Sequence, residues 1–253
     1  MGKVEEQESG IKSRCTRPGR HDPVARFFWK RPVSAVGQSP QIEIANAAWT
    51  SPGIQQFINC PFDSEYDSLL RPILFTIIYL GYNPQIASQR SDSDEQRINK
   101  ILSLILKSKF SVHDLSRIKS AKPGEFFRLN MPFELGIDYG CRRIGSEHLR
   151  RKRFLVLGGK PHDYKKALSD LGGVDAKSHA NQPNKAVLAL RNWFVDTVHF
   201  SAADSPTVIW YRFMDFNTEF YERRKAEGFS KGDLKMMPVS EYSRPFLKGD
   251  KLI

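Results

Sequence analysis

The stretch Gln56-Phe57-Ile58-Asn59-Cys60, followed by Pro61-Phe62-Asp63-Ser64, decides the fold. A short apolar run that stops at a Pro-Asp-Ser turn predicts a buried strand with a polar loop at its end. From Glu65 to Leu80 the apolar residues recur at helical spacing, and Gly81 ends the pattern. Pro72 lies inside this helix and predicts a kink or a later helix start. A buried strand that leads into an amphipathic helix is the repeating unit of an α/β domain.

The same alternation continues along the chain. Four further strands are expected at residues 82–87, 110–114, 153–157 and 177–179, and Pro84 favours an edge position for the first of them. Helices are expected through residues 98–106, 164–171 and 183–198, the first of them capped by Asp92, Ser93 or Asp94. Strands that alternate with helices predict a parallel sheet with helices on both faces. We assign residues 53–200 to this α/β domain.

Two segments lie outside the alternating pattern. Residues 1–52 are basic, rich in Gly, Pro and Ser, and without a clear period, so we expect a disordered extension. It is either a basic arm for a partner or nucleic acid, or a leader without a role, and we favour the leader. Residues 206–253 form a helical appendage with a dense aromatic face on residues 208–225. Those aromatic residues are expected to pack on the sheet domain or on a second subunit of a homo-oligomer.

Composition limits the classes of protein. The chain has 253 residues, a net charge of +11 and a pI near 9.6, a balance that attracts nucleic acid, phosphorylated small molecules or anionic lipid. No apolar run reaches the ~18 residues that span a bilayer, and no apolar signal core opens the chain. Cys15, Cys60 and Cys141 lack C-x-x-C spacing, so neither disulfides nor a zinc site is expected. We therefore expect a cytoplasmic protein with no membrane contact.

Polar residues follow two of the expected strands and open one helix. Asn59 and Asp63 follow the first strand, and Asp114 and Ser116 follow the strand at residues 110–114. The helix start at Asn130 carries Glu134, and ligands of open parallel sheets bind at the carboxyl ends of the strands. Pro132 suits the first turn and Asn130 suits the cap, so the helix dipole is expected to favour the charged form of Glu134.

The missing motifs narrow the chemistry. The chain has no G-x-G-x-x-G, no G-x-x-x-x-G-K-[ST] and no G-x-S-x-G, which argues against a Rossmann dehydrogenase, a P-loop NTPase and an acyl-transfer triad. Carboxylate chemistry on a nucleoside or nucleotide remains, because one carboxylate can stabilise or attack an oxocarbenium-like sugar. Glu134 is the candidate catalytic residue, and Asp114 or Asp63 is expected to orient ribose hydroxyls. Arg97 and Arg90 are candidates to meet a phosphate, and we expect neither a metal nor a resident cofactor.

Several residues also have ordinary structural explanations. His113 lies within a strand, so a hydrogen-bonded core histidine is favoured over a general base. Asp114 could cap the next turn, and Asn59 could satisfy loop backbone. Asp138 is expected to be a solvated or partner-bound charge, and the basic run at residues 142–153 is expected to be a solvated loop. Gly136 and Gly140 lie one turn apart and predict close packing of their helix on the sheet.

A family resemblance rests on three blocks of residues. Phe57-Ile58-Asn59-Cys60-Pro61-Phe62-Asp63, with Leu80-Gly81-Tyr82 at the helix end, looks like the start of a Toll/interleukin-1 receptor (TIR)-like domain. His113-Asp114-Leu115-Ser116 and Asn130-Met131-Pro132-Phe133-Glu134-Leu135-Gly136 resemble the Asp-Leu-Thr…Asn-x-x-x-x-Glu-Leu-Gly pattern of bacterial TIR-like and nucleoside 2-deoxyribosyltransferase-like proteins. The resemblance covers residues 54–200. The loop at residues 117–129 departs from it, because it is longer and more basic than the family's short link.

The resemblance implies a flavodoxin-like fold with Glu134 as the matched catalytic glutamate. That glutamate is the nucleophile in the transferases and the essential acid in the NAD glycohydrolases. NAD or a nucleotide is then the substrate, and a role in bacterial antiphage defence with a defence-system partner is expected. The alternative is a non-catalytic module of the same fold that senses a nucleotide or binds a protein. Direct binding of nucleic acid by the basic surface is a third, weaker expectation.

Overall fold

The sheet has five parallel strands in the order β2-β1-β3-β4-β5. The computed structural model describes residues 54–87, 95–120, 123–124, 128–171 and 173–247. The strands are β1 (Gln55–Asn59), β2 (Asn83–Ile86), β3 (Phe110–Asp114), β4 (Arg153–Gly158) and β5 (Ala176–Ser178). This confirms the flavodoxin-like α/β fold and the edge position of the strand that contains Pro84. The extension at residues 1–52, the three expected caps Asp92, Ser93 and Asp94, and Arg90 all lie outside the described residues.

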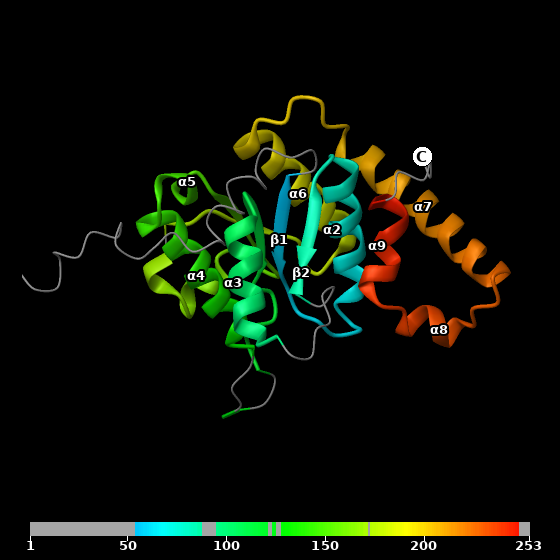
Figure 1. Ribbon diagram of the computed structural model, residues 1–253, viewed down its shortest axis with the longest axis horizontal. Helices are drawn as coiled ribbons and strands as arrows, with labels where there is room; N and C mark the ends of the chain where they lie inside the picture. The colour runs from blue at the N-terminus through cyan, green and yellow to red at the C-terminus, as the bar shows by residue number, and fades with distance from the viewer. Residues whose placement is uncertain (1–53, 88–94, 121–122, 125–127, 172, 248–253) are drawn as a thin grey trace, which may run out of the picture. The chain divides into compact units, whose positions relative to one another are not determined.

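Helices cover both faces of the sheet. Figure 1 shows α3 (Arg97–Lys107) and α4 (Asn130–Ile144) on one side, and α2 (Asp67–Tyr79), α6 (Pro183–Val198) and α7 (Pro206–Ala226) on the other. Helix α2, which follows β1, and helix α3, which leads into β3, cover opposite faces of the sheet. Strands β1 and β3 are neighbours in the sheet but not in sequence, and the strand order reverses between them. In sheets of this kind that switch point is where ligands bind.

The aromatic face of α7 belongs to the hydrophobic core. Phe213, Phe216 and Phe220 are buried, and the ring of Phe216 lies 5.8 Å from that of Phe75 on α2. Tyr242 of α9 (Val239–Leu247) packs edge-on against Phe220 at 5.1 Å between ring centroids. Between α7 and α9 lies α8 (Lys231–Met236), which starts with a capping box between Ser230 and Asp233. These aromatic side chains therefore serve packing rather than an exposed stacking surface.

Some local expectations are wrong. Helix α2 is continuous through Pro72, so no later start occurs. Residues 164–171 form two 3₁₀ turns, Asp163–Lys166 and Ser169–Leu171, held by a hydrogen bond from the buried Tyr164 hydroxyl to the Val174 carbonyl. Apart from the nearby backbone of α4 itself, a Cβ atom at Gly136 or Gly140 would meet nothing within 4 Å among the residues that the structure describes. Neither glycine therefore marks a close approach to the sheet.

The helix start at α4 also differs from the expected one. The N-cap is Leu129, and Asn130 is the first helical residue rather than the cap. Arg128, just before the cap, has a φ of 52°, in the left-handed region, which turns the chain into the helix. Short α5 (Glu147–Arg150), before β4, was not anticipated. No helix in the described part of the chain is both long and apolar enough to cross a membrane.

Candidate functional site

The carboxyl ends of β1 and β3 lie side by side at the switch point of the sheet. Asn59 pairs with His113 in the register of the two strands, which brings Cys60 next to Asp114. The Asn59 side-chain amide donates to the Met131 carbonyl at 2.9 Å and so ties the end of β1 to the first turn of α4. The sequence therefore placed Asn59, Asp114 and the start of α4 together correctly.

Asp114 is a buried carboxylate that the protein itself surrounds with donors. The Tyr66 hydroxyl and His179 Nε2 lie 2.5 and 3.0 Å from Oδ2, and the Ser116 amide donates to Oδ1 at 2.8 Å. His179 Nδ1 accepts from the Asn181 amide at 3.0 Å, so Nε2 carries the proton that points to Asp114. Burial by itself would raise the pKa of Asp114, but the hydrogen bonds from these partners, that of His179 foremost, lower it.

These contacts show one of the two roles considered for Asp114 from sequence, and its role in orienting ribose hydroxyls stays a prediction. Asp114 caps the turn that contains Ser116, and both of its oxygens are engaged within the protein.

Glu134 is the opposite case, a buried carboxylate with little to hold its charge. The residue is 3% exposed, and within the described residues its Oε1 has no hydrogen-bond partner. Arg97 Nη2 of α3 lies 4.0 Å from that oxygen. Burial raises the pKa of Glu134 to about 7, and the charge of Arg97 opposes the rise. Burial therefore acts against the helix dipole, which was expected to favour the charged form of Glu134.

A chain of buried polar groups joins the ends of β1 and β3 to α4 and to the start of β4. Asn59 donates to His113 Nδ1 at 3.1 Å, so His113 carries its proton on Nε2, which lies 3.0 Å from Asp138 Oδ2. Lys152 Nζ lies 3.2 Å from Asp138 Oδ1 and also donates to the carbonyls of Ile105 and Ser108. His113 is thus a bonded core histidine, as expected. Asp138 and Lys152 are fully buried, so of the two expected forms Asp138 is the bound charge and not the solvated one. The expectation of a wholly solvated basic run is wrong.

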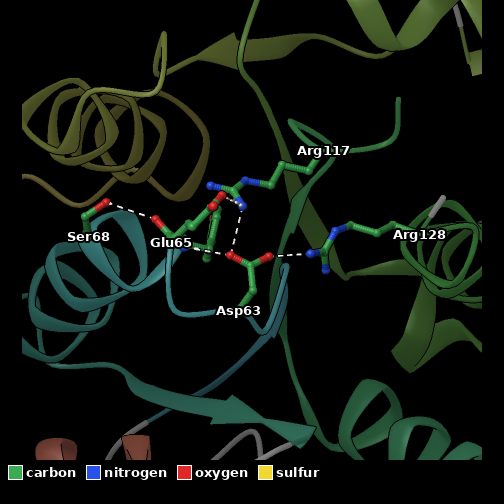
Figure 2. Close-up of polar contacts among 6 residues, drawn as sticks. Asp63, Glu65, Ser68, Arg117 and Arg128 are labelled. Atoms are coloured by element: carbon green, nitrogen blue, oxygen red, sulfur yellow. Dashed lines mark hydrogen bonds and ion pairs between the residues drawn. The ribbon is translucent and has the colours of Figure 1, made fainter. Parts of the chain in front are cut away.

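Asp63 joins the loop after β1 to the basic loop after β3 (Figure 2). Its Oδ1 accepts from the Tyr66 amide at 2.9 Å and from Arg117 Nη1 at 2.8 Å, and its Oδ2 pairs with Arg128. Arg117 Nη1 also lies 3.1 Å from Glu65 Oε2. Asp63 therefore gathers two guanidinium groups at the carboxyl edge of the sheet.

Cys60 is a buried residue that directly follows β1 at this edge. Burial raises the pKa of its thiol well above the ordinary value, and the carboxylates of Asp114, Glu134 and Asp63 raise it further. All three carboxylates are therefore near enough to this thiol for their charges to act on it.

The remaining predicted residues are less engaged. Ser116 has a buried hydroxyl with no hydrogen-bond partner among the residues described, and Asn130 is exposed on the first turn of α4. Tyr66, His179, Arg117 and Arg128 were not singled out from sequence. The position of His179 directly after β5, at the same edge of the sheet, was a usable signal.

A separate hollow of about 730 Å³ lies between α2, α7 and α8 and does not include Glu134. Its lining is mixed, with Trp210 and Tyr221 beside Arg71 and Lys225. Across the described ranges no group of three or more His, Cys, Asp or Glu side chains could hold a metal ion. The hollow is thus a different place from the sheet edge around Glu134, where the candidate catalytic residue lies.

Comparison with known proteins adds no assignment. No family model, curated protein or solved structure matches the chain. The resemblance to TIR-like and deoxyribosyltransferase-like proteins thus remains an expectation from the sequence.

Proposed function

We propose that the protein cleaves the N-glycosidic bond of NAD or a related nucleotide or nucleoside, with Glu134 as the catalytic carboxylate. The observation that carries the proposal is the isolation of Glu134. Its side chain is buried, its pKa is near neutral, and in the described part of the chain Arg97 is the one cation within 4.0 Å of its carboxylate. A carboxyl group with a pKa near the working pH can both hold and release a proton, which suits acid–base or nucleophilic work.

The contrast with Asp114 supports this choice. Two carboxylates lie at one sheet edge, and their surroundings push their pKa values in opposite directions. Asp114 is ionised and saturated with donors, whereas Glu134 retains an oxygen without a hydrogen-bond partner in the described part of the chain. Such a pair is typical of sites in which one carboxylate positions and the other reacts.

In the proposed reaction the bond between C1′ of the ribose and the base nitrogen breaks, and its electron pair leaves with the base. From NAD the pyridinium leaves as neutral nicotinamide and needs no proton. The ionised Glu134 stabilises the oxocarbenium-like sugar or attacks C1′, and a water then adds its oxygen to C1′ and loses a proton. A neutral base from a deoxynucleoside takes up one proton as it departs.

The test is release of free base from NAD and from deoxynucleosides by the full chain, followed by liquid chromatography at several protein concentrations. Glu134→Gln keeps the shape but not the charge and is expected to lower the rate by at least about 100-fold. Glu222→Gln, an exposed glutamate on α7, is the matched control and is expected to keep the full rate. Undiminished release by Glu134→Gln would exclude Glu134 as the catalytic residue.

The second candidate is a non-catalytic module that binds a nucleotide at the same edge. It is favoured by the engagement of Asp114 and Asp63 within the protein, since neither carboxylate has an oxygen free of a protein contact to orient ribose hydroxyls. Calorimetry with a panel of nucleotides separates the two functions. Binding with no base released supports the module, and absence of binding excludes it.

A further inference from the structure

The geometry points to a phosphate-binding site made by Arg117 and Arg128, in which the carboxylate of Asp63 occupies the anion's place in the free protein. The inference deepens the proposed function and, as far as the substrate is concerned, rests on it. The substrate class becomes phosphorylated, a nucleotide or dinucleotide rather than a bare nucleoside.

The two arginines come from opposite ends of one basic loop and meet at one carboxylate (Figure 2). Arg117 follows β3 by three residues, and Arg128 stands just before the N-cap of α4. Each oxygen of Asp63 pairs with a different guanidinium. Two guanidinium groups that converge on one carboxylate also suit the oxygens of a phosphate, because arginine forks match both groups in geometry.

The contacts of the cluster are those of an exchangeable site rather than of a buried structural ion pair. The side chains of Asp63, Arg117 and Arg128 are 27%, 26% and 25% exposed, so an anion from solution can reach them. Arg117 uses Nη1 for both Asp63 and Glu65, and among the described residues Nε and Nη2 have no acceptor, which leaves them for a phosphate oxygen. A dianionic phosphate carries more charge than Asp63 and competes for the same donors.

The cluster of Asp63, Arg117 and Arg128 lies at the same edge of the sheet as Glu134, so one nucleotide can contact both. Asp63 lies in the loop after β1, and the last residue of that strand, Asn59, bonds the first turn of α4, the helix that carries Glu134. The charges of both carboxylates raise the pKa of the buried Cys60 thiol. Arg97, Arg117 and Arg128 then present three cations along the carboxyl edge of the sheet, from α3 and from the loop before α4. In the site we propose, a nucleotide with its ribose at Glu134 has its 5′ phosphate at this row of arginines.

The experiment is isothermal calorimetry of the full chain with inorganic pyrophosphate, which has no glycosidic bond and so reports the anion site alone. Arg117→Ala and Arg128→Ala are each expected to weaken binding by about tenfold or more. Lys119→Ala is the matched control, since it removes a cation of the same loop that pairs with Asp163 instead. It is expected to change the affinity less than about twofold.

Asp63→Asn provides the opposite change. Asparagine still accepts from the Tyr66 amide but no longer attracts the arginines, so pyrophosphate is expected to bind about three- to tenfold more tightly. A gain in affinity cannot come from misfolding, which keeps the proposal testable if an arginine variant is unstable. Asp163→Asn, the partner of Lys119, is the control and is expected to leave the affinity unchanged.

The outcomes separate this inference from the proposed function. If neither Arg117→Ala nor Arg128→Ala binds more weakly than Lys119→Ala, or if no variant binds pyrophosphate, the phosphate site is refuted. If base is released from deoxynucleosides while pyrophosphate does not bind, the catalytic proposal for Glu134 is supported and the phosphate site is refuted. If pyrophosphate binding depends on both arginines but no substrate releases base, the site stands and the catalytic proposal falls.

Discussion

Glu134→Gln is expected to stabilise the folded protein at pH 8 and to leave its stability almost unchanged at pH 4. Burial raises the pKa of Glu134 to about 7, against an ordinary value of 4.5, which the unfolded chain is taken to have. A difference of about 2.5 corresponds to about 3 kcal/mol of penalty for the charged form in the folded state. Glutamine carries no charge, so the variant is expected to avoid most of that penalty.

The sign follows from the binding of protons. Below about pH 4.5 the carboxyl is protonated in both states and costs nothing. Between about pH 4.5 and pH 7 the folded protein holds the proton and the unfolded chain has lost it, so the wild-type stability falls as the pH rises. Above about pH 7 the full penalty applies, and the gap between wild type and variant becomes constant.

The assay is urea denaturation at a series of pH values from 4 to 9, with the free energy of unfolding extrapolated to water. Glu222→Gln is the matched control, because its carboxylate is 65% exposed and pairs with Lys225 on the same helix. It is expected to shift the free energy of unfolding by no more than about 0.5 kcal/mol at any pH. Parallel curves for the wild type and Glu134→Gln would show that Glu134 is not held in a desolvated position, and the reasoning would fail.

Two further variants test the packing around the site. Asp138→Asn leaves the buried Lys152 ammonium without its counter-charge and is expected to lower the free energy of unfolding, measured by urea denaturation, by about 3–5 kcal/mol. The double variant Asp138→Asn with Lys152→Met is expected to recover part of that loss. Burial by itself would raise the pKa of Asp138, but the charge of Lys152 outweighs it, and the pKa is lowered to about 2. The stability that the ionised Asp138 contributes is therefore present above about pH 4 and is lost as the pH falls toward 2. Phe216→Ala opens a cavity between α7 and α2 and is expected to cost about 3–5 kcal/mol, whereas Tyr211→Ala, 64% exposed on the same helix, changes little. Equal losses at Phe216 and Tyr211 would contradict the docking of α7 through its aromatic face.

The periodic part of the sequence predicted the sheet well. The helix at residues 183–198 coincides with α6, and the strand at residues 110–114 coincides with β3, because both patterns are long or sharply bounded. The errors fall where local signals are weak. The cap of α4 is Leu129 rather than Asn130, since Arg128 turns the chain by backbone conformation alone and no capping side chain is used.

The site was only half visible in the sequence. Alternation of strands and helices put Asn59, Asp114 and Glu134 at one edge, because carboxyl ends of parallel strands share an edge. Pairings between distant residues were not visible, such as Asp63 with Arg128 or Asp138 with Lys152. Periodicity shows which face a residue takes, but the partner of a buried charge depends on how the other helices pack against that face.

The electrostatics around Glu134 rank the possible substrates. In the free protein near pH 7 its carboxyl is shared between the protonated and ionised forms, because only Arg97 offsets the cost of burial. A ligand that brings positive charge to this carboxyl favours the ionised form and is held by it, since charges interact strongly away from water. The pyridinium of NAD carries such a charge and a neutral deoxynucleoside does not, while the phosphates of NAD suit the arginines at Asp63. Both ends of the proposed site therefore favour a dinucleotide with a cationic base over a neutral nucleoside, most strongly above pH 7, where the carboxyl of Glu134 is already ionised in the free protein.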